Sequence, residues 1–73
     1  MEIQHYFSFR TNGRPREEGE QVMHKIHMLG AKNIFFHVVP QTNECKFGFR
    51  SDDCNEDKIF LYLATLKECR VYM

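Results

Sequence analysis

Apolar and polar residues alternate along the first segment of the chain, IQHYFSF, which covers residues 3–9. Ile3, Phe7 and Phe9 fall on one side of an extended strand, while Tyr6 falls on the other side with polar neighbours. A strand with this pattern buries one face and leaves the other in solvent. The alternation therefore predicts a half-buried strand over residues 2–10.

Two later segments have the apolar spacing of amphipathic helices. The first covers residues 15–29, and its Pro15 suits the first turn of a helix because that position needs no backbone N–H. The second covers residues 54–69 and begins at Asp53 and Glu56, a pair whose spacing is typical of a capping box. The pattern therefore predicts two helices of about four turns each.

Three further segments are rich in β-branched and aromatic residues, and they predict strands over residues 33–39, 44–50 and 70–73. The order of elements is then strand, helix, strand, strand, helix, strand. Two right-handed crossovers joined by a hairpin give a ferredoxin-like βαββαβ sandwich, an α+β fold. We expect one antiparallel sheet in the order 4-1-3-2, with both helices on one face, in a single domain over residues 1–73.

Composition excludes several classes of protein. The chain has 73 residues, with ten basic and ten acidic side chains, so its net charge favours neither a strongly basic nucleic-acid binder nor an acidic mimic. Its three cysteines have no C-x-x-C spacing, which argues against a disulfide framework and a zinc knuckle. No apolar run is long enough to cross a bilayer. We expect a cytoplasmic protein with no membrane association and no cofactor.

The segment ECKFGFRS, residues 44–51, resembles part of the signature of the RNA recognition motif, which shares the ferredoxin-like fold. The resemblance implies that Phe47 and Phe49 face solvent and stack on unpaired bases. Strand alternation would then bury Lys46 and Arg50 without partners, at a cost of several kcal/mol each. We therefore predict the opposite phase, with both rings on the helix side of the sheet.

This phase gathers aromatic and basic side chains on the outer face of the sheet, with Tyr72 as a further candidate at one edge. The strand over residues 33–39 is also apolar on both sides, more than one layer of helices explains. We expect a small, non-catalytic regulatory or adaptor module that binds a protein partner, or a second copy as a homodimer. The alternative is single-stranded RNA or DNA bound by the same face. The predicted binding residues are Tyr6, Arg10, Phe35, His37, Lys46 and Arg50.

The loop RTNGRPR collects three arginines near the start of the first helix, where an anion is favoured. In the alternative, these arginines pair with neighbouring glutamates in a solvated turn. Phe9 and Arg10 before this loop also resemble acylphosphatase, which implies an enzyme with Arg10 on a phosphate and Asn43 as the nearest candidate for positioning water. The glycine-rich approach to that arginine is absent, so we predict that the chain is not an enzyme. The candidate anion ligands are Arg10, Arg14 and Arg16.

The remaining histidine and cysteine candidates lack the neighbouring residues that a metal site or a reactive thiolate needs. His24 and His27 are three residues apart, a spacing that suits one metal ion, but no third ligand is evident beside them. Cys54 starts the second helix, where the neighbouring Asp52 and Asp53 oppose a thiolate. We expect neither a metal site nor a cysteine nucleophile.

Overall fold

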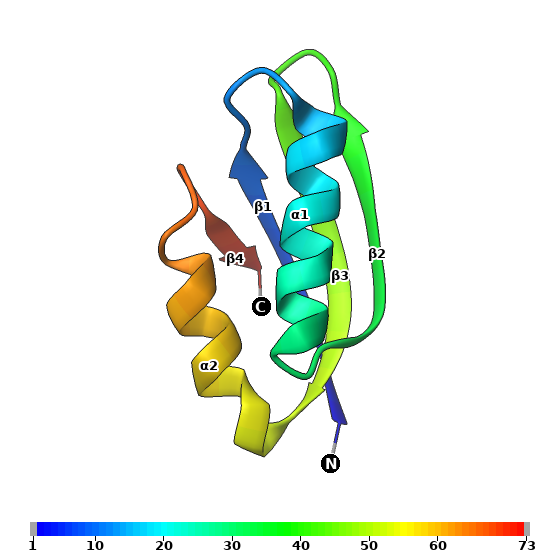
Figure 1. Ribbon diagram of the computed structural model, residues 1–73, viewed down its shortest axis with the longest axis vertical. Helices are drawn as coiled ribbons and strands as arrows, with labels where there is room; N and C mark the ends of the chain where they lie inside the picture. Colours follow the sequence, from blue (N-terminus) through cyan, green and yellow to red (C-terminus); the bar gives the residue numbers. More distant parts are fainter. Residues whose placement is uncertain (1, 73) are drawn as a thin grey trace.

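The computed structural model describes residues 2–72 and shows one four-stranded antiparallel sheet with two helices on one of its faces (Figure 1). The strand order is β2-β3-β1-β4, which confirms the predicted ferredoxin-like arrangement. The elements in chain order are β1 (Glu2–Arg10), α1 (Pro15–Met28), β2 (Lys32–Val39), β3 (Glu44–Asp52), α2 (Asp53–Leu63) and β4 (Arg70–Tyr72).

The register of the sheet decides which side chains share a face. β1 and β3 form the central pair, from Glu2 opposite Asp52 to Arg10 opposite Glu44, without interruption. The short β4 pairs with the middle of β1, and β2 pairs with the other edge of β3 after a register shift beyond Lys32. Because side chains alternate along each strand, this register sets the composition of both faces.

The core lies between the sheet and the helices and is dominated by aromatic rings. Phe47 and Phe49 are 2% and 0% exposed, which confirms their predicted direction. The exposure that the resemblance to the RNA recognition motif implies is therefore wrong for these two rings. Phe47 stacks between Phe7 and Phe36, with ring centroids 4.8 Å away in each case. A domain this small needs these rings inside because it buries only about 60% of its unfolded surface.

The two helices cover different parts of the sheet. In Figure 1, α1 lies in front of β3 with β2 beside it, while α2 lies on the side that holds β4. α1 buries Val22 and Ile26, and α2 buries Ile59 and Leu63, at the spacings that the sequence predicts.

The second helix differs from its prediction at both ends. It ends at Leu63 rather than at Cys69, because the chain must turn back before β4. In this turn the Thr65 hydroxyl donates a hydrogen bond to the Tyr62 carbonyl at 2.6 Å. The predicted capping box is also wrong, since no side chain caps this helix. Glu56 instead binds His5, with 2.9 Å between Oε1 and Nε2.

Candidate interaction surface on the outer sheet face

A row of aromatic side chains crosses the sheet on the face away from the helices, here called the outer face. Phe35 of β2 lies opposite Gly48 of β3, Gly48 lies opposite Tyr6 of β1, and Tyr6 lies opposite Tyr72 of β4. The exposed fractions of Phe35, Tyr6 and Tyr72 are 54%, 48% and 47%. These three residues with Gly48, here called the aromatic row, span all four strands and leave about half of each ring in solvent.

Gly48 gives the aromatic row its shape. A Cβ atom at this position would lie 2.2 Å from Cζ of Phe35, so the Phe35 ring occupies the space above the glycine. Any larger residue would push the ring away from the sheet. The strand therefore uses a glycine here for close approach of a side chain to the backbone.

Tyr72 is held in the row by a hydrogen bond. Its hydroxyl lies 2.9 Å from Oγ of Ser8, and the Ser8 side chain is fully buried although it belongs to the outer face. The bond joins β4 to β1 and keeps the Tyr72 ring close to the sheet. A ring fixed in this way loses little conformational entropy when a ligand binds.

Basic side chains flank the aromatic row. Lys46 and Arg70 share the register position of Ser8 on one side, while Arg50 lies on the other side and donates from Nε to Oε1 of Gln4 at 3.1 Å. Within residues 2–72, none of these three cations has a carboxylate oxygen within 4.0 Å. The centre of the outer face is therefore aromatic and positively charged.

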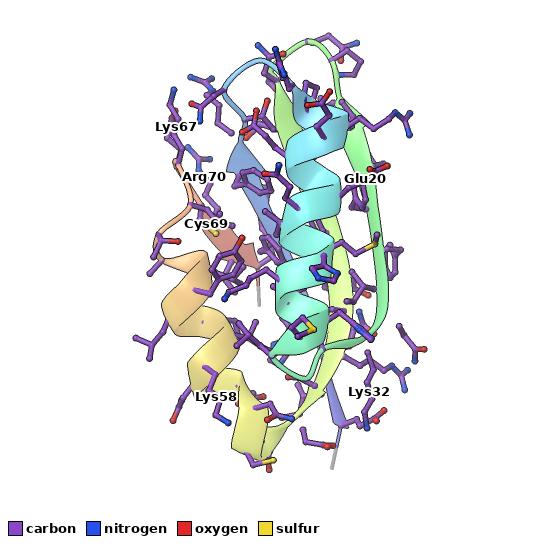
Figure 2. All side chains as sticks on the ribbon, viewed as in Figure 1. Glu20, Lys32, Lys58, Lys67, Cys69 and Arg70 are labelled. Carbon is purple, nitrogen blue, oxygen red and sulfur yellow. The ribbon has the colours of Figure 1, made fainter. Side chains whose placement is uncertain are left out.

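The ends of the outer face carry ion pairs instead. Arg10 lies 3.2 Å from Glu68, and Lys32 lies 3.1 Å from Glu2 and 3.8 Å from Asp52. The hydrogen bond with Glu2, followed by the charge of Asp52, raises the pKa of Lys32. Figure 2 shows Lys32 and Arg70 near opposite edges of the sheet. Because the end cations are neutralised, the unpaired charge concentrates around the aromatic row.

All six predicted binding residues lie on the outer face. Five of them, namely Tyr6, Phe35, His37, Lys46 and Arg50, lie in or beside the aromatic row, and Arg10 lies at the end of β1. The residues that sequence reasoning missed are Gly48, as the seat of Phe35, and Arg70, whose position depends on the pairing of the short β4. Alternation from Tyr72 could have placed Arg70 on the same face, but a sequence pattern does not specify which residues of β1 lie opposite a three-residue strand.

The backbone amides of the arginine loop are already engaged by a carboxylate. The carboxylate of Glu18 accepts the backbone N–H groups of Asn12 at 2.9 Å and Arg14 at 3.1 Å, so it occupies the amides that an anion would use. Arg14 pairs with Glu17 at 3.5 Å, whereas Arg10 lies on the outer face. Arg10 and Arg14 have different surroundings, and anion binding by Arg10, Arg14 and Arg16 stays a prediction.

Arg10 and Asn43, the two residues of the acylphosphatase resemblance, do line one open depression of about 500 Å³ together with Lys67. The Asn43 carbonyl accepts two hydrogen bonds from Thr11, one from its amide at 2.7 Å and one from its hydroxyl at 2.9 Å. The Arg10 guanidinium is engaged with Glu68. That the chain is not an enzyme remains a prediction.

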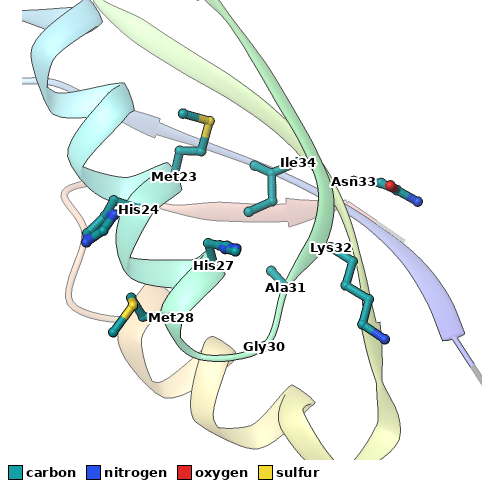
Figure 3. A pocket seen from close by; sticks show the side chains of 9 residues that line it. All are labelled: Met23, His24, His27, Met28, Gly30, Ala31, Lys32, Asn33 and Ile34. Carbon is teal, nitrogen blue, oxygen red and sulfur yellow. The ribbon is translucent and has the colours of Figure 1, made fainter.

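The three histidines considered as candidates, His24, His27 and His5, line a groove or pack in the fold. His24 and His27 line a groove beside α1 (Figure 3), and residues 2–72 contain no group of three or more side chains placed to hold a metal ion. His5 packs against the rings of Phe49 and Phe60, at centroid distances of 5.2 and 5.1 Å. The Glu56 carboxylate provides a hydrogen-bond partner for Nε2 of this imidazole at 2.9 Å.

All three cysteines are free thiols. Cys45 is buried and its Sγ donates to the Pro15 carbonyl at 3.1 Å, whereas Cys54 is exposed at the start of α2. Burial raises the pKa of Cys45, with a smaller effect from the charge of Glu18, and burial also raises the pKa of Cys69. A raised pKa keeps both thiols protonated and unreactive at neutral pH.

Comparison with known proteins supports the fold. No protein-family model and no curated protein sequence matches the chain. Among solved structures, the chain is similar to the uncharacterized protein TM1266 from Thermotoga maritima, with a TM-score of 0.63 and 9% sequence identity, over 99% of this chain and 94% of that one. At this identity the similarity establishes a shared fold and nothing about activity. No helix within residues 2–72 is both long and apolar enough to span a membrane.

Proposed function

We propose that this chain is a non-catalytic regulatory or adaptor module that binds another protein on the outer face of its sheet. The observation that carries the proposal is the aromatic row, in which Phe35, Tyr6 and Tyr72 each leave about half of their surface exposed. Small proteins need their aromatic side chains in the core, so exposing three of them on one face requires a reason. Aromatic rings and arginine are the residues that most often anchor protein interfaces.

The free energy that burial of the three exposed rings would contribute is large enough for a specific protein interface. With roughly 200 Å² for a whole aromatic side chain, the three rings expose about 300 Å² together. Burying that area corresponds to about 7 kcal/mol before the entropic cost of association is subtracted. The three flanking cations favour a partner whose contacting segment is acidic. The free cysteines support a reducing compartment such as the cytoplasm.

A second candidate is single-stranded nucleic acid. The observation that favours it is the position of Lys46, Arg50 and Arg70 beside exposed rings, with no carboxylate within 4.0 Å among the described residues. Single-strand binding proteins combine stacking rings with cations that contact phosphates. The buried direction of Phe47 and Phe49 removes the rings that an RNA recognition motif uses on this strand.

Affinity capture from the native host tests the proposal and separates the two candidates. Tagged wild-type chain is compared with Tyr6→Ala on the outer face and with Leu61→Ala on α2, a matched control because Leu61 is 73% exposed on the helix side. We expect a discrete protein that survives nuclease treatment, is lost with Tyr6→Ala and is retained with Leu61→Ala.

Two outcomes of the capture experiment would contradict the proposed protein binding by the outer face. Recovery of nucleic acid alone, with binding that weakens steeply as salt rises, would favour the second candidate. A partner that Tyr6→Ala retains and Leu61→Ala loses would move the interface to the helix side and refute the proposal.

A further inference from the structure

β2 is an edge strand whose free edge lacks the usual protection. Among residues 2–72 it pairs only with β3, and it lies at the edge of the sheet (Figure 1), so the backbone groups of its other edge have no strand partner there. Natural edge strands carry charges, prolines or bulges that block pairing with another chain. Here the register shift beyond Lys32 and the following Pro40 protect only the two ends. The six residues Ile34–Val39 include no Asp, Glu, Lys or Arg.

The helix side of this edge offers an apolar lining. A groove of about 790 Å³ lies between α1 and β2, and in Figure 3 Met23, His27, Ala31 and Ile34 face one another across it. A second depression of about 620 Å³ continues along the strand past Val38; it shares Met23 with the first and also has Arg16 and Glu20 in its lining. Side chains on the inner side of β2 are therefore only partly covered by α1.

We propose that a second copy of this chain pairs its β2 antiparallel to this β2, so that the two sheets become one continuous sheet. In a two-fold antiparallel pair, directly opposed residues point to the same face. Ile34, Phe36 and Val38 of one copy then meet the same apolar set of the other in the groove. Phe35, His37 and Val39 meet on the outer side.

The distribution of charge selects this edge for a second copy. Stacking two outer faces would bring Lys46, Arg50 and Arg70 against their own counterparts, which costs free energy. Edge pairing keeps Lys46 and Arg50 on the neighbouring β3, about 5 Å or more from the seam. The central part of β2 brings no Asp, Glu, Lys or Arg to the seam, and the two charged residues of α1 beside it, Arg16 and Glu20, have opposite signs. The seam includes the outer side of Phe35 but leaves Tyr6 and Tyr72 free, and the dimer is tested separately from the proposed function of the outer face.

Sedimentation of the purified chain over a range of concentrations tests the proposal. We expect a reversible monomer–dimer equilibrium, and Val38→Lys should weaken the dimer about 100-fold because the lysine is desolvated at the seam. The matched control is Val71→Lys, the same change on the inner side of the opposite edge strand, where Val71 is 44% exposed. It should leave the dimer unchanged. A monomer at all concentrations, a dimer that Val38→Lys leaves intact, or one that only Val71→Lys dissociates would overturn the proposal.

Amide hydrogen exchange on the wild-type chain gives a second readout that does not depend on any variant folding. We expect protection of Ile34–Val39 to rise with protein concentration, while protection of Arg70–Tyr72 stays constant. Protection that is independent of concentration would contradict edge pairing. Protection of β2 that rises only when another protein is added would assign the edge to that protein instead.

Discussion

Replacing Gly48 by alanine tests whether the aromatic row is built as described. The added Cβ would lie 2.2 Å from Cζ, 2.7 Å from Cε1 and 2.8 Å from Cε2 of Phe35, so the ring must leave its position above the strand. The three atoms belong to the end of a flexible side chain, and the backbone pairing of β3 is not obstructed. The substitution therefore removes one side-chain contact without breaking the sheet.

The expected magnitude follows from the exposed fraction of Phe35. The ring is 54% exposed, so about 90 Å² of roughly 200 Å² is covered. Losing this contact costs up to about 2 kcal/mol, while alanine in place of glycine in a strand contributes about 0.5–1 kcal/mol in the other direction. We expect Gly48→Ala to lower the free energy of unfolding by about 1 kcal/mol.

Urea unfolding followed by circular dichroism measures this change, and a double-mutant cycle isolates its cause. In a Phe35→Ala background, Gly48→Ala should be neutral or stabilising, because no ring remains to be displaced. The coupling between the two positions should be about 2 kcal/mol. Equal effects of Gly48→Ala in both backgrounds would show that Phe35 does not rest on Gly48, and the description of the row would be wrong.

Three further outcomes follow from the packing and from the pKa directions. Gly19→Ala should lower the free energy of unfolding by about 1 kcal/mol or more in the same assay, because its Cβ would lie 2.5 Å from the stacked Phe36 ring; no loss would contradict the close packing of α1 on β2. In labelling with a thiol reagent, Cys54 should react at once and Cys45 only on unfolding, and equal rates would contradict the burial of Cys45. The free energy of unfolding should fall above about pH 9 because four groups have a raised pKa in the folded chain. Such groups stabilise the fold below their ordinary pKa and lose this contribution as the pH rises through the folded value. A free energy of unfolding that rises above about pH 9 would contradict the raised pKa values. The groups are Lys32, Cys45, Tyr62 and Cys69.

The order of the strands followed from the order of the elements and the right-handed crossovers, and the phase of β3 followed from alternation. A phase that buries Phe47 also exposes Lys46 to water, so the same phase suits the apolar residue and the charged one. The end of α2 did not follow, because Leu66 continues the helical spacing although the chain has already turned. The length of the connection to β4 decides that end, and it depends on tertiary structure.

The candidate surface was predictable in its central part and less so at its edges. Alternation alone places Tyr6 and Arg50 on one face. The seat of Phe35 on Gly48 depends on the register between two strands, which the register shift in β2 alters. The occupation of the loop amides by Glu18 was also hidden, because six residues separate it from Asn12 and only the turn brings them together.

The most direct test of the central claim is amide chemical-shift mapping of the isotopically labelled chain with a captured and purified partner. The account predicts that the largest changes centre on Tyr6, Phe35 and Gly48 and extend to Arg70–Tyr72 of β4, while α1 and α2 change little. Changes centred on the exposed sides of the two helices, with the aromatic row unaffected, would contradict the assignment of the outer face as the binding surface.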